Sequence, residues 1–331
     1  MSKVLIRADG GATVGMGHLM RCRTLAIALQ LRGWKTVFLS EGVPGEGFAD
    51  DQGRKFEVVD PSRSGTNGAG TAQVAEQTQA DLVLIDTYTF GMKDFLALWK
   101  SGRPLVVIDD LADRGLPVDA VINPNPLFPD TRYREQGIPH CLIGSDYCLI
   151  RPEVLVARQL SVRQERHLLV TLGGGGVPEV LLPLLPIMES SDFHQITVMA
   201  STSAPKLEAW VQAHATRWQI CRDFSSLPRL VAEADAVVSA GGTTLWEVYC
   251  VGRPSLAIVW VDNQRHALRV VDAQRTGTVV DLRRGFDEQV FTRAWQEFLD
   301  SRQDQDCIER QQQLIDGRGA ERAAEVLLRL G

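Results

Sequence analysis

The sequence lacks the features of membrane-spanning, secreted and nucleic-acid-coating proteins. No apolar run is long enough to span a membrane, and the chain enters a strand-like segment at once, so we expect no secretory leader. The formal net charge is −6 and the isoelectric point is about 5.6, which argues against a broad basic surface. We therefore expect a cytoplasmic protein that neither binds nucleic acid nor inserts into a membrane.

Cysteine patterns that indicate metal or redox chemistry are also missing. The six cysteines are scattered, none forms a C-x-x-C pair, and several lie within apolar or helical patterns, which favours buried reduced thiols. Asp109, Asp110 and Asp113 could suggest a metal, but no histidine or glutamate completes a plausible ligand set. We expect no metal and no cofactor.

What the chain does contain is a regular alternation of strand-length apolar runs and helix-period stretches. A length of 331 residues favours two domains, and continuous apolar strands separated by helices indicate parallel sheets covered on both faces. Residues 117–152 are irregular and rich in proline, so we place the junction there. The prediction is an α/β protein with two Rossmann-like domains, 1–150 and 151–331, whose last helix, about 319–330, could cross back. The predicted strands are residues 4–9, 35–40, 56–60, 81–86 and 105–110, then 167–172, 196–200, 219–224, 236–240, 255–261 and 279–282.

A glycine-rich turn that ends in His18 lies between the first strand and the first helix. Glycines such as Gly17 let a ligand approach the backbone closely, and a helix N-terminus favours negative charge. A histidine there, which can exchange a proton near neutral pH, is a good candidate for a general base. The alternative is a core or capping histidine. We take His18 as the first catalytic candidate.

Three further side chains follow strand ends near this turn. Asp9 and Asp86 each end a strand and could orient the imidazole of His18 or position water. Helix capping is the alternative for both aspartates. Tyr88 could donate a hydrogen bond to a substrate oxygen. Arg21 and Arg23, one turn into the helix, are interpreted as solvated or ion-paired residues rather than substrate clamps.

Three turns in the second half have the form of ligand-binding loops, because ligands bind at the carboxyl ends of parallel strands. Gly173 and Gly174 begin a four-glycine run between a strand and a helix, which is typical of a phosphate cradle, although a turn without a ligand remains the alternative. Together with the His18 turn, these loops predict one cleft between the two domains.

The second of these turns, Gly241-Gly242, is followed by Thr243 and Thr244. We expect one of the two threonines to cap the next helix and bind a phosphate oxygen, and Glu247 to accept the hydroxyls of a ribose. The alternative is a purely structural capping box of Thr244 and Glu247.

In the third turn, Asn263 and Gln264 lie between a strand and a helix. Their amide groups suit sugar hydroxyls and acetamido groups. The alternative is an asparagine helix cap with exposed neighbours.

At this point the residues resemble a known family. Residues 4–26 look like the opening of the nucleotide-sugar hydrolases of pseudaminic acid biosynthesis (PseG), and further matching segments follow in the same order over nearly the whole chain. The second half also resembles MurG-type transferases, which have the GT-B architecture of two Rossmann-like domains. The matching segments are residues 85–88, 108–114, 147–152, the turn at 173, 240–247 and 254–264.

The resemblance implies a GT-B-like fold and hydrolysis of UDP-2,4-diacetamido-2,4,6-trideoxy-β-L-altropyranose to UDP and the free sugar. It also implies metal-independent cleavage of the anomeric C–O bond, with His18 as the base that activates water and Glu247 on the ribose. The chain departs from the family at Asp9-Gly10-Gly11, where Asp-Ser-Ser or Asp-Ser-Thr is usual, and at Thr87, where histidine is usual.

Three functions stay open from the sequence. The first is a nucleotide-sugar hydrolase, and the second is a GT-B glycosyltransferase that passes the sugar of a UDP-sugar donor to an acceptor. The third is an inert nucleotide-sugar binding protein. A small-molecule UDP-sugar is the expected partner, and replacement of His18 separates an enzyme from an inert binder.

Overall fold

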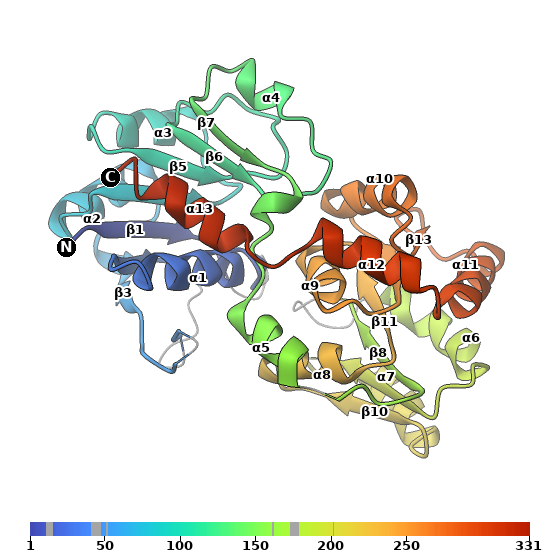
Figure 1. Ribbon diagram of the computed structural model, residues 1–331. Helices are drawn as coiled ribbons and strands as arrows, with labels where there is room; N and C mark the ends of the chain where they lie inside the picture. Colours follow the sequence, from blue (N-terminus) through green and yellow to red (C-terminus); the bar gives the residue numbers. More distant parts are fainter. Residues whose placement is uncertain (11–15, 41–47, 51, 161, 173–178, 201) are drawn as a thin grey trace. The chain divides into compact units, whose positions relative to one another are not determined.

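The computed structural model describes the chain except for residues 11–15, 41–47, 51, 161, 173–178 and 201. The described chain divides into two compact units (Figure 1). Unit 1 consists of residues 1–151 together with 317–331, and unit 2 consists of residues 152–316. Each unit is built on its own parallel sheet.

The sheet of unit 1 has the strand order β3-β2-β1-β4-β5-β6-β7, and neighbouring strands run parallel. Near-continuous apolar strands in the middle of this order, such as β1 and β4, are buried on both faces by helices. The strands are β1 Lys3–Ala8, β2 Lys35–Leu39, β3 Glu57–Val59, β4 Leu82–Asp86, β5 Leu105–Ile108, β6 Ala120–Asn123 and β7 His140–Ile143. The helices are α1 Gly17–Gln30, α2 Gly68–Gln77, α3 Met92–Trp99, α4 Thr131–Arg134 and α13 Gly319–Leu327, with 3₁₀ turns at Pro61–Arg63 and Ser145–Tyr147.

The irregular segment 117–152 contributes β6 and β7 to this sheet, which the sequence pattern did not predict. Each of these strands has only four residues and is bordered by loop residues that include several prolines. Such short runs show no periodicity, so they resemble loop. The whole segment up to Arg151 belongs to unit 1.

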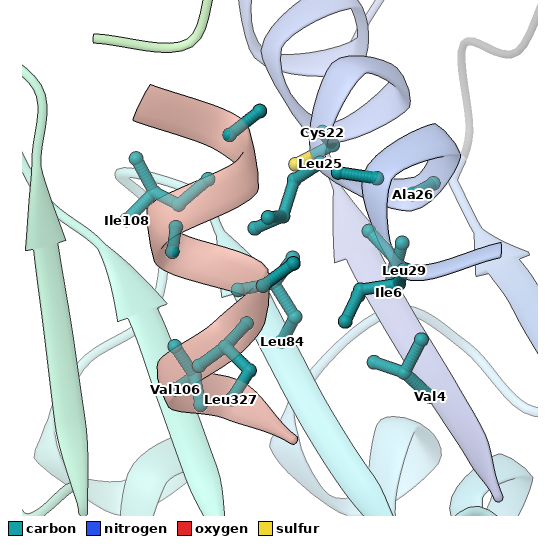
Figure 2. Close-up of a cluster of buried hydrophobic side chains, with 14 of the residues drawn as sticks. Val4, Ile6, Cys22, Leu25, Ala26, Leu29, Leu84, Val106, Ile108 and Leu327 are labelled. Carbon is teal, nitrogen blue, oxygen red and sulfur yellow. The ribbon is translucent and has the colours of Figure 1, made fainter. Parts of the chain in front are cut away.

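The last helix, α13, packs in unit 1 and closes the apolar cluster between α1 and the sheet. Its buried residues Ala320, Ala323, Ala324 and Leu327 follow the i, i+3, i+4, i+7 spacing of one helical face. Figure 2 shows Leu327 beside Leu84 and Val106 of the sheet, with Leu25 and Leu29 of α1 in the same cluster. Burial of a side chain such as Leu327 stabilises the fold by about 1.5–3 kcal/mol.

Unit 2 has the strand order β10-β9-β8-β11-β12-β13, again with parallel neighbours. Its strands are β8 His167–Thr171, β9 Gln195–Met199, β10 Trp218–Cys221, β11 Ala236–Ala240, β12 Ser255–Val259 and β13 Thr278–Asp281. Its helices are α5 Pro152–Leu160, α6 Leu185–Glu189, α7 Pro205–Ala213, α8 Leu227–Glu233, α9 Thr243–Val251, α10 Arg265–Gln274, α11 Glu288–Ser301 and α12 Gln305–Leu314. The 3₁₀ turns are Glu179–Leu184, Phe224–Ser226 and Asp262–Gln264.

One predicted helix of unit 2 takes another form. The expected helix at 178–188 is instead a 3₁₀ turn over Glu179–Leu184 followed by the short α6, and residue 178 lies outside the described residues. Pro183 and Pro186 explain this, because proline removes a backbone donor and interrupts an α-helical ladder.

Among the described residues, no helix is both long and apolar enough to cross a membrane.

Candidate active site

The strand order of unit 1 reverses at β1, which pairs with β2 on one side and β4 on the other. A reversal of this kind leaves an open crevice at the carboxyl ends of the strands, where ligands bind in such sheets. Ala8 at the end of β1 is in register with Asp86 at the end of β4, and the N–H of Asp9 donates to the carbonyl of Asp86 at 3.2 Å. The turn leading to His18 therefore starts beside Asp86.

His18 lies in the first turn of α1, next to the helix start, and only 8% of its surface is exposed. The N-cap of α1 is Met16 and no side chain caps it, so His18 is not a capping histidine. The Nδ1 atom of His18 lies 2.5 Å from Oδ1 of Asp86. Because the carboxylate accepts, Nδ1 carries the hydrogen, and in the neutral ring the lone pair is on Nε2. No described residue forms a hydrogen bond with Nε2, which leaves that atom for water or a ligand.

Asp86 is fully buried and is held as a carboxylate. Arg21 donates hydrogen bonds to both of its oxygens, from Nε to Oδ2 and from Nη2 to Oδ1, each at 2.6 Å. Burial alone would raise the pKa of Asp86, but the charges of Arg21 and then His18 outweigh it and keep that pKa well below the ordinary range. Asp86 is thus a permanent acceptor that fixes the tautomer of His18.

Arg21 continues the network to Asp110 and Tyr88. Its Nη1 donates to both oxygens of Asp110, at 3.0 and 2.8 Å, and the hydroxyl of Tyr88 donates to Asp110 at 2.7 Å. The Tyr88 ring stands edge-on to the imidazole of His18, with the ring centres 4.7 Å apart. The interpretation of Arg21 as an ion-paired residue is therefore confirmed. The sequence did not indicate that one of its partners is the carboxylate that binds His18.

One sequence prediction needs correction at this site, and another stays untested. Asp9 does not contact His18; it pairs with Arg7 at 2.6 Å and accepts a hydrogen bond from the hydroxyl of Thr87. Asp86, which the register of β1 and β4 places beside Ala8, binds the imidazole instead. The hydroxyl of Tyr88 donates to Asp110 and its ring contacts the imidazole of His18, and its hydrogen bond to a substrate oxygen stays a prediction.

Gly17 is the first residue of α1, and a Cβ built on it would meet no atom of the described residues within 4 Å. Among the described residues, the space beside Gly17 is therefore open, as close approach of a ligand requires. The preceding glycine, Gly15, lies outside the described residues.

The two glycines after β11 in unit 2 differ in their surroundings. A Cβ on Gly241 would lie 2.8 Å from Cβ of Ala267 on α10 and 3.1 Å from Cγ2 of Val259, so Gly241 lets α10 pack closely. A Cβ on Gly242 would meet no atom of the described residues within 4 Å. Among those residues, open space for a ligand is thus found at Gly242 and not at Gly241.

The prediction that a threonine caps α9 is wrong. The N-cap is Gly242 and no side chain caps the helix, so Thr243 and Thr244 are its first two residues, and the alternative of a capping box is not formed either. Their N–H groups have no intrahelical acceptors, because the first turn of any helix lacks them. Glu247 lies further along α9 and is only 3% exposed, so this residue is buried within unit 2.

Asn263 and Gln264 lie in the 3₁₀ turn before α10, where Asn263 is exposed and Gln264 is the N-cap. The side-chain oxygen of Gln264 accepts from the N–H of Trp260 at 3.2 Å, which fixes the loop after β12. Asn263 does not cap the helix, and its carbonyl faces Nδ1 of His266 at 3.0 Å.

Gly173 and Gly174 lie outside the described residues. Strand β8, which precedes them in the sequence, ends at Thr171, and its neighbour β11 ends at Ala240, where the order of this sheet reverses. Thr171 and Ser239 are register partners there, and neither buried hydroxyl has a hydrogen-bond partner among the described residues. The reversal point of unit 2 therefore has hydrogen-bonding groups that the described chain does not use.

The carboxylates considered for a metal have protein partners. Asp110 binds Arg21, and Asp109 accepts a hydrogen bond from the hydroxyl of Tyr133 at 2.6 Å. Within the described residues, no three side chains of histidine, cysteine, aspartate or glutamate are grouped as metal ligands.

Comparison with known proteins identifies the fold of the chain. No family model matches the chain. The spore coat polysaccharide biosynthesis protein SpsG of Bacillus subtilis is 26% identical over 289 residues, which cover 84% of this chain and 82% of SpsG. MurG of Acinetobacter baumannii aligns with a TM-score of 0.68 at 14% identity, covering 99% of this chain and all of that chain. The fold is GT-B-like.

Other solved structures agree with this fold. A UDP-N-acetylglucosamine 2-epimerase from Listeria monocytogenes aligns with a TM-score of 0.66 at 14% identity, over 98% of this chain and 95% of that chain. The calicheamicin glycosyltransferase CalG4 aligns with a TM-score of 0.63 at 15% identity, over 100% and 98%. The predicted fold class is confirmed, and these low identities support the fold alone.

Proposed function

We propose that the chain is a nucleotide-sugar hydrolase. It cleaves the anomeric C–O bond of a UDP-linked sugar with inversion and without a metal, and it releases UDP and the free sugar. The observation that carries the proposal is the hydrogen bond of His18 to the buried carboxylate of Asp86, which leaves Nε2 without a described partner.

His18 has the geometry of a general base. Asp86 holds the Nδ1–H tautomer, so the lone pair of Nε2 can take a proton from water. The water oxygen attacks the anomeric carbon, the bond from that carbon to the phosphate oxygen breaks, and UDP leaves with the electron pair. The proton on Nε2 makes an imidazolium, which the neighbouring carboxylate of Asp86 stabilises.

Unit 2 is assigned the nucleotide. The uncapped start of α9 presents N–H groups and the positive end of a helix dipole, and the open face of Gly242 leaves room for a diphosphate. Thr243 and Thr244 border this position, and Asn263 and Gln264 lie in the turn after the neighbouring strand β12. Stabilisation of the departing diphosphate by backbone N–H groups is a means of lowering the barrier without a cation.

The names of the similar proteins support this substrate class. SpsG is described by its role in spore coat polysaccharide biosynthesis. The structural neighbours include the S. aureus MnaA–UDP structure and the Listeria epimerase that is named for UDP-N-acetylglucosamine. We assign the chain to nucleotide-sugar metabolism of a surface polysaccharide, and the resemblance to PseG selects a UDP-diacetamido-trideoxyhexose as the first substrate to test.

The decisive experiment offers the purified full chain a panel of UDP-, GDP-, CMP- and dTDP-sugars and measures the nucleotide released. In ¹⁸O-labelled water, cleavage of the anomeric C–O bond puts the label in the sugar and none in the nucleotide. We expect His18→Ala to lower turnover by about 10²–10⁴-fold. His140→Ala, at an exposed histidine of the same unit, is the matched control and keeps the wild-type rate.

The outcomes separate the alternatives. Nucleotide release that requires an added acceptor, and is absent with water alone, would make the chain a transferase. Binding of a UDP-sugar without any turnover would make it an inert binder. Unchanged turnover in His18→Ala would remove His18 from the role of base.

A further inference from the structure

The candidate base is one end of a row of buried side chains that come from three elements. His18 and Arg21 lie on α1, Asp86 ends β4 and Asp110 follows β5. Arg21 is the link, because it binds both oxygens of Asp86 with Nε and Nη2 and both oxygens of Asp110 with Nη1. Its Nη2 also lies 3.3 Å from Nδ1 of His18. One guanidinium therefore connects Asp110 to the ring.

The formal charges show what this connection does. If only Asp86 and Arg21 stood beside His18, their charges would cancel, and protonation of the ring would leave a net positive charge in a site that is nearly closed to water. Asp110 adds a second carboxylate, so the group carries one negative charge in excess. Protonation of His18 then brings the group to neutrality, which favours the proton transfer that the base performs.

We propose that Asp110 is a positioning residue for the hydrolytic reaction: through Arg21 it sets the charge balance around His18 and thereby the ease with which the ring accepts a proton. This inference rests on the proposed function and extends it to Asp110 and Arg21, neither of which needs to touch the substrate. Asp110 is itself held by the hydroxyl of Tyr88 at 2.7 Å and by the side-chain amide of Asn125 at 3.4 Å.

The other titratable groups that face the ring stay neutral or are paired elsewhere. The thiol of Cys22 donates to Asp86 at 3.5 Å, and burial together with Asp86 raises its pKa. Burial and the charge of Asp110 raise the pKa of Tyr88, which remains a neutral donor. On β1, Arg7 pairs with Asp9. Among the described residues, Asp86 contacts the ring, Arg21 contacts Asp86, and Asp110 contacts Arg21.

The test compares Asp110→Asn with Asp113→Asn. Both remove one negative charge without changing side-chain size, but Asp113 is exposed in the same loop and has no ion pair among the described residues. The histidine rings of the full chain are isotopically labelled, and the His18 NMR signal is assigned by its loss in His18→Gln. The pH titration of that signal is recorded for each variant, alongside the pH profile of kcat/KM for nucleotide release.

We expect the His18 titration of Asp110→Asn to move to lower pH by about one unit, as removal of a nearby opposite charge requires, and the acid limb of the kcat/KM profile to move with it. Asp113→Asn should leave both in place. Coincident titrations of the wild type and Asp110→Asn would overturn the proposal.

The design keeps this inference separate from the proposed function. If no nucleotide sugar is hydrolysed but the NMR titration moves, the proposed function fails and the electrostatic link stands. Should Asp110→Asn fail to fold, Arg21→Met gives the complementary test, because removal of the positive charge moves the same titration to higher pH. A shift to lower pH or no shift in Arg21→Met would then overturn the inference.

Discussion

Alanine at Gly241 and at Gly242 tests two different reasons for the glycines in the turn after β11. A methyl group on Gly241 would lie 2.8 Å from Cβ of Ala267, whereas carbon atoms in contact prefer about 3.5–4.0 Å. Ala267 has no longer side chain that could rotate away, so α10 itself must move. The same methyl group on Gly242 would meet no atom of the described residues within 4 Å.

The magnitude follows from these contacts. Overpacking of a tight core position costs about 1–3 kcal/mol, and the loss of glycine's freedom in the unfolded chain offsets about 0.4–1 kcal/mol of that cost. We therefore expect Gly241→Ala to lower the free energy of unfolding by about 1–2 kcal/mol. At about 2–4 °C per kcal/mol for a unit of this size, the melting midpoint of unit 2 falls by about 2–8 °C.

Gly242→Ala should leave the stability unchanged and weaken the binding of UDP. Gly242 has a backbone φ of −110°, which alanine can adopt, so the melting midpoint stays near that of the wild type. The proposal places the diphosphate in the open space beside Gly242, and the methyl group takes part of that space. We expect UDP affinity to fall at least tenfold by titration calorimetry, or by about 1.4 kcal/mol.

Either of two results would refute this reasoning. If Gly241→Ala melts like the wild type, the close approach of α10 does not constrain the turn. If Gly242→Ala binds UDP with wild-type affinity, the diphosphate does not lie beside Gly242.

Three further predictions concern the core, acid stability and metals. Leu327→Ala should lower the free energy of unfolding by about 2–5 kcal/mol in urea denaturation, because this fully buried side chain fills the cluster under α13, whereas Glu325→Ala on the exposed face should change it by less than about 0.5 kcal/mol. The low pKa of Asp86 stabilises the fold above the ordinary carboxylate range, and this contribution is lost as the pH falls toward the lowered value, so stability measured from about pH 5 downward should fall less steeply in Asp86→Asn than in the wild type. Nucleotide release should be unchanged after dialysis against EDTA, and activity that disappears and returns with added Mg²⁺ or Mn²⁺ would contradict the metal-free mechanism.

Much of the fold could be predicted because its elements differ sharply in pattern. Strands such as β1 and β4 are continuous apolar runs, and the helices between them follow a helical period. The short strands β6 and β7 could not be predicted in the same way, because four residues bordered by prolines carry no period. Their place in the sheet follows from pairing with β5.

The candidate site could be predicted in part. His18 and Asp86 stood out because each follows or ends a strand at the edge where ligands bind. Which carboxylate meets the imidazole depends on the order and register of β1 and β4, which no local pattern contains. The role of Arg21 had one available signal: it lies three residues after His18, on the same face of a helix that is otherwise largely apolar. Its partner Asp110 required the position of β5 beside β4.

The capping of α9 illustrates a smaller limit. A threonine after two glycines favours a capping role in the sequence, but the helix begins one residue earlier than that role needs. Gly242 is the N-cap, so Thr243 is already the first helical residue.

Because α13 belongs to unit 1, the two units are completed in a fixed order during synthesis of the chain. Ribosomes add about 5–20 residues per second from the N-terminus, so all of unit 2 is made before residues 317–331 exist. Until then, the apolar side chains of α1 and of the sheet lack the packing that Leu327 and its neighbours provide (Figure 2). The unit that is begun first is thus finished last, and the helix carrying His18 acquires its full packing only when translation reaches the last helix.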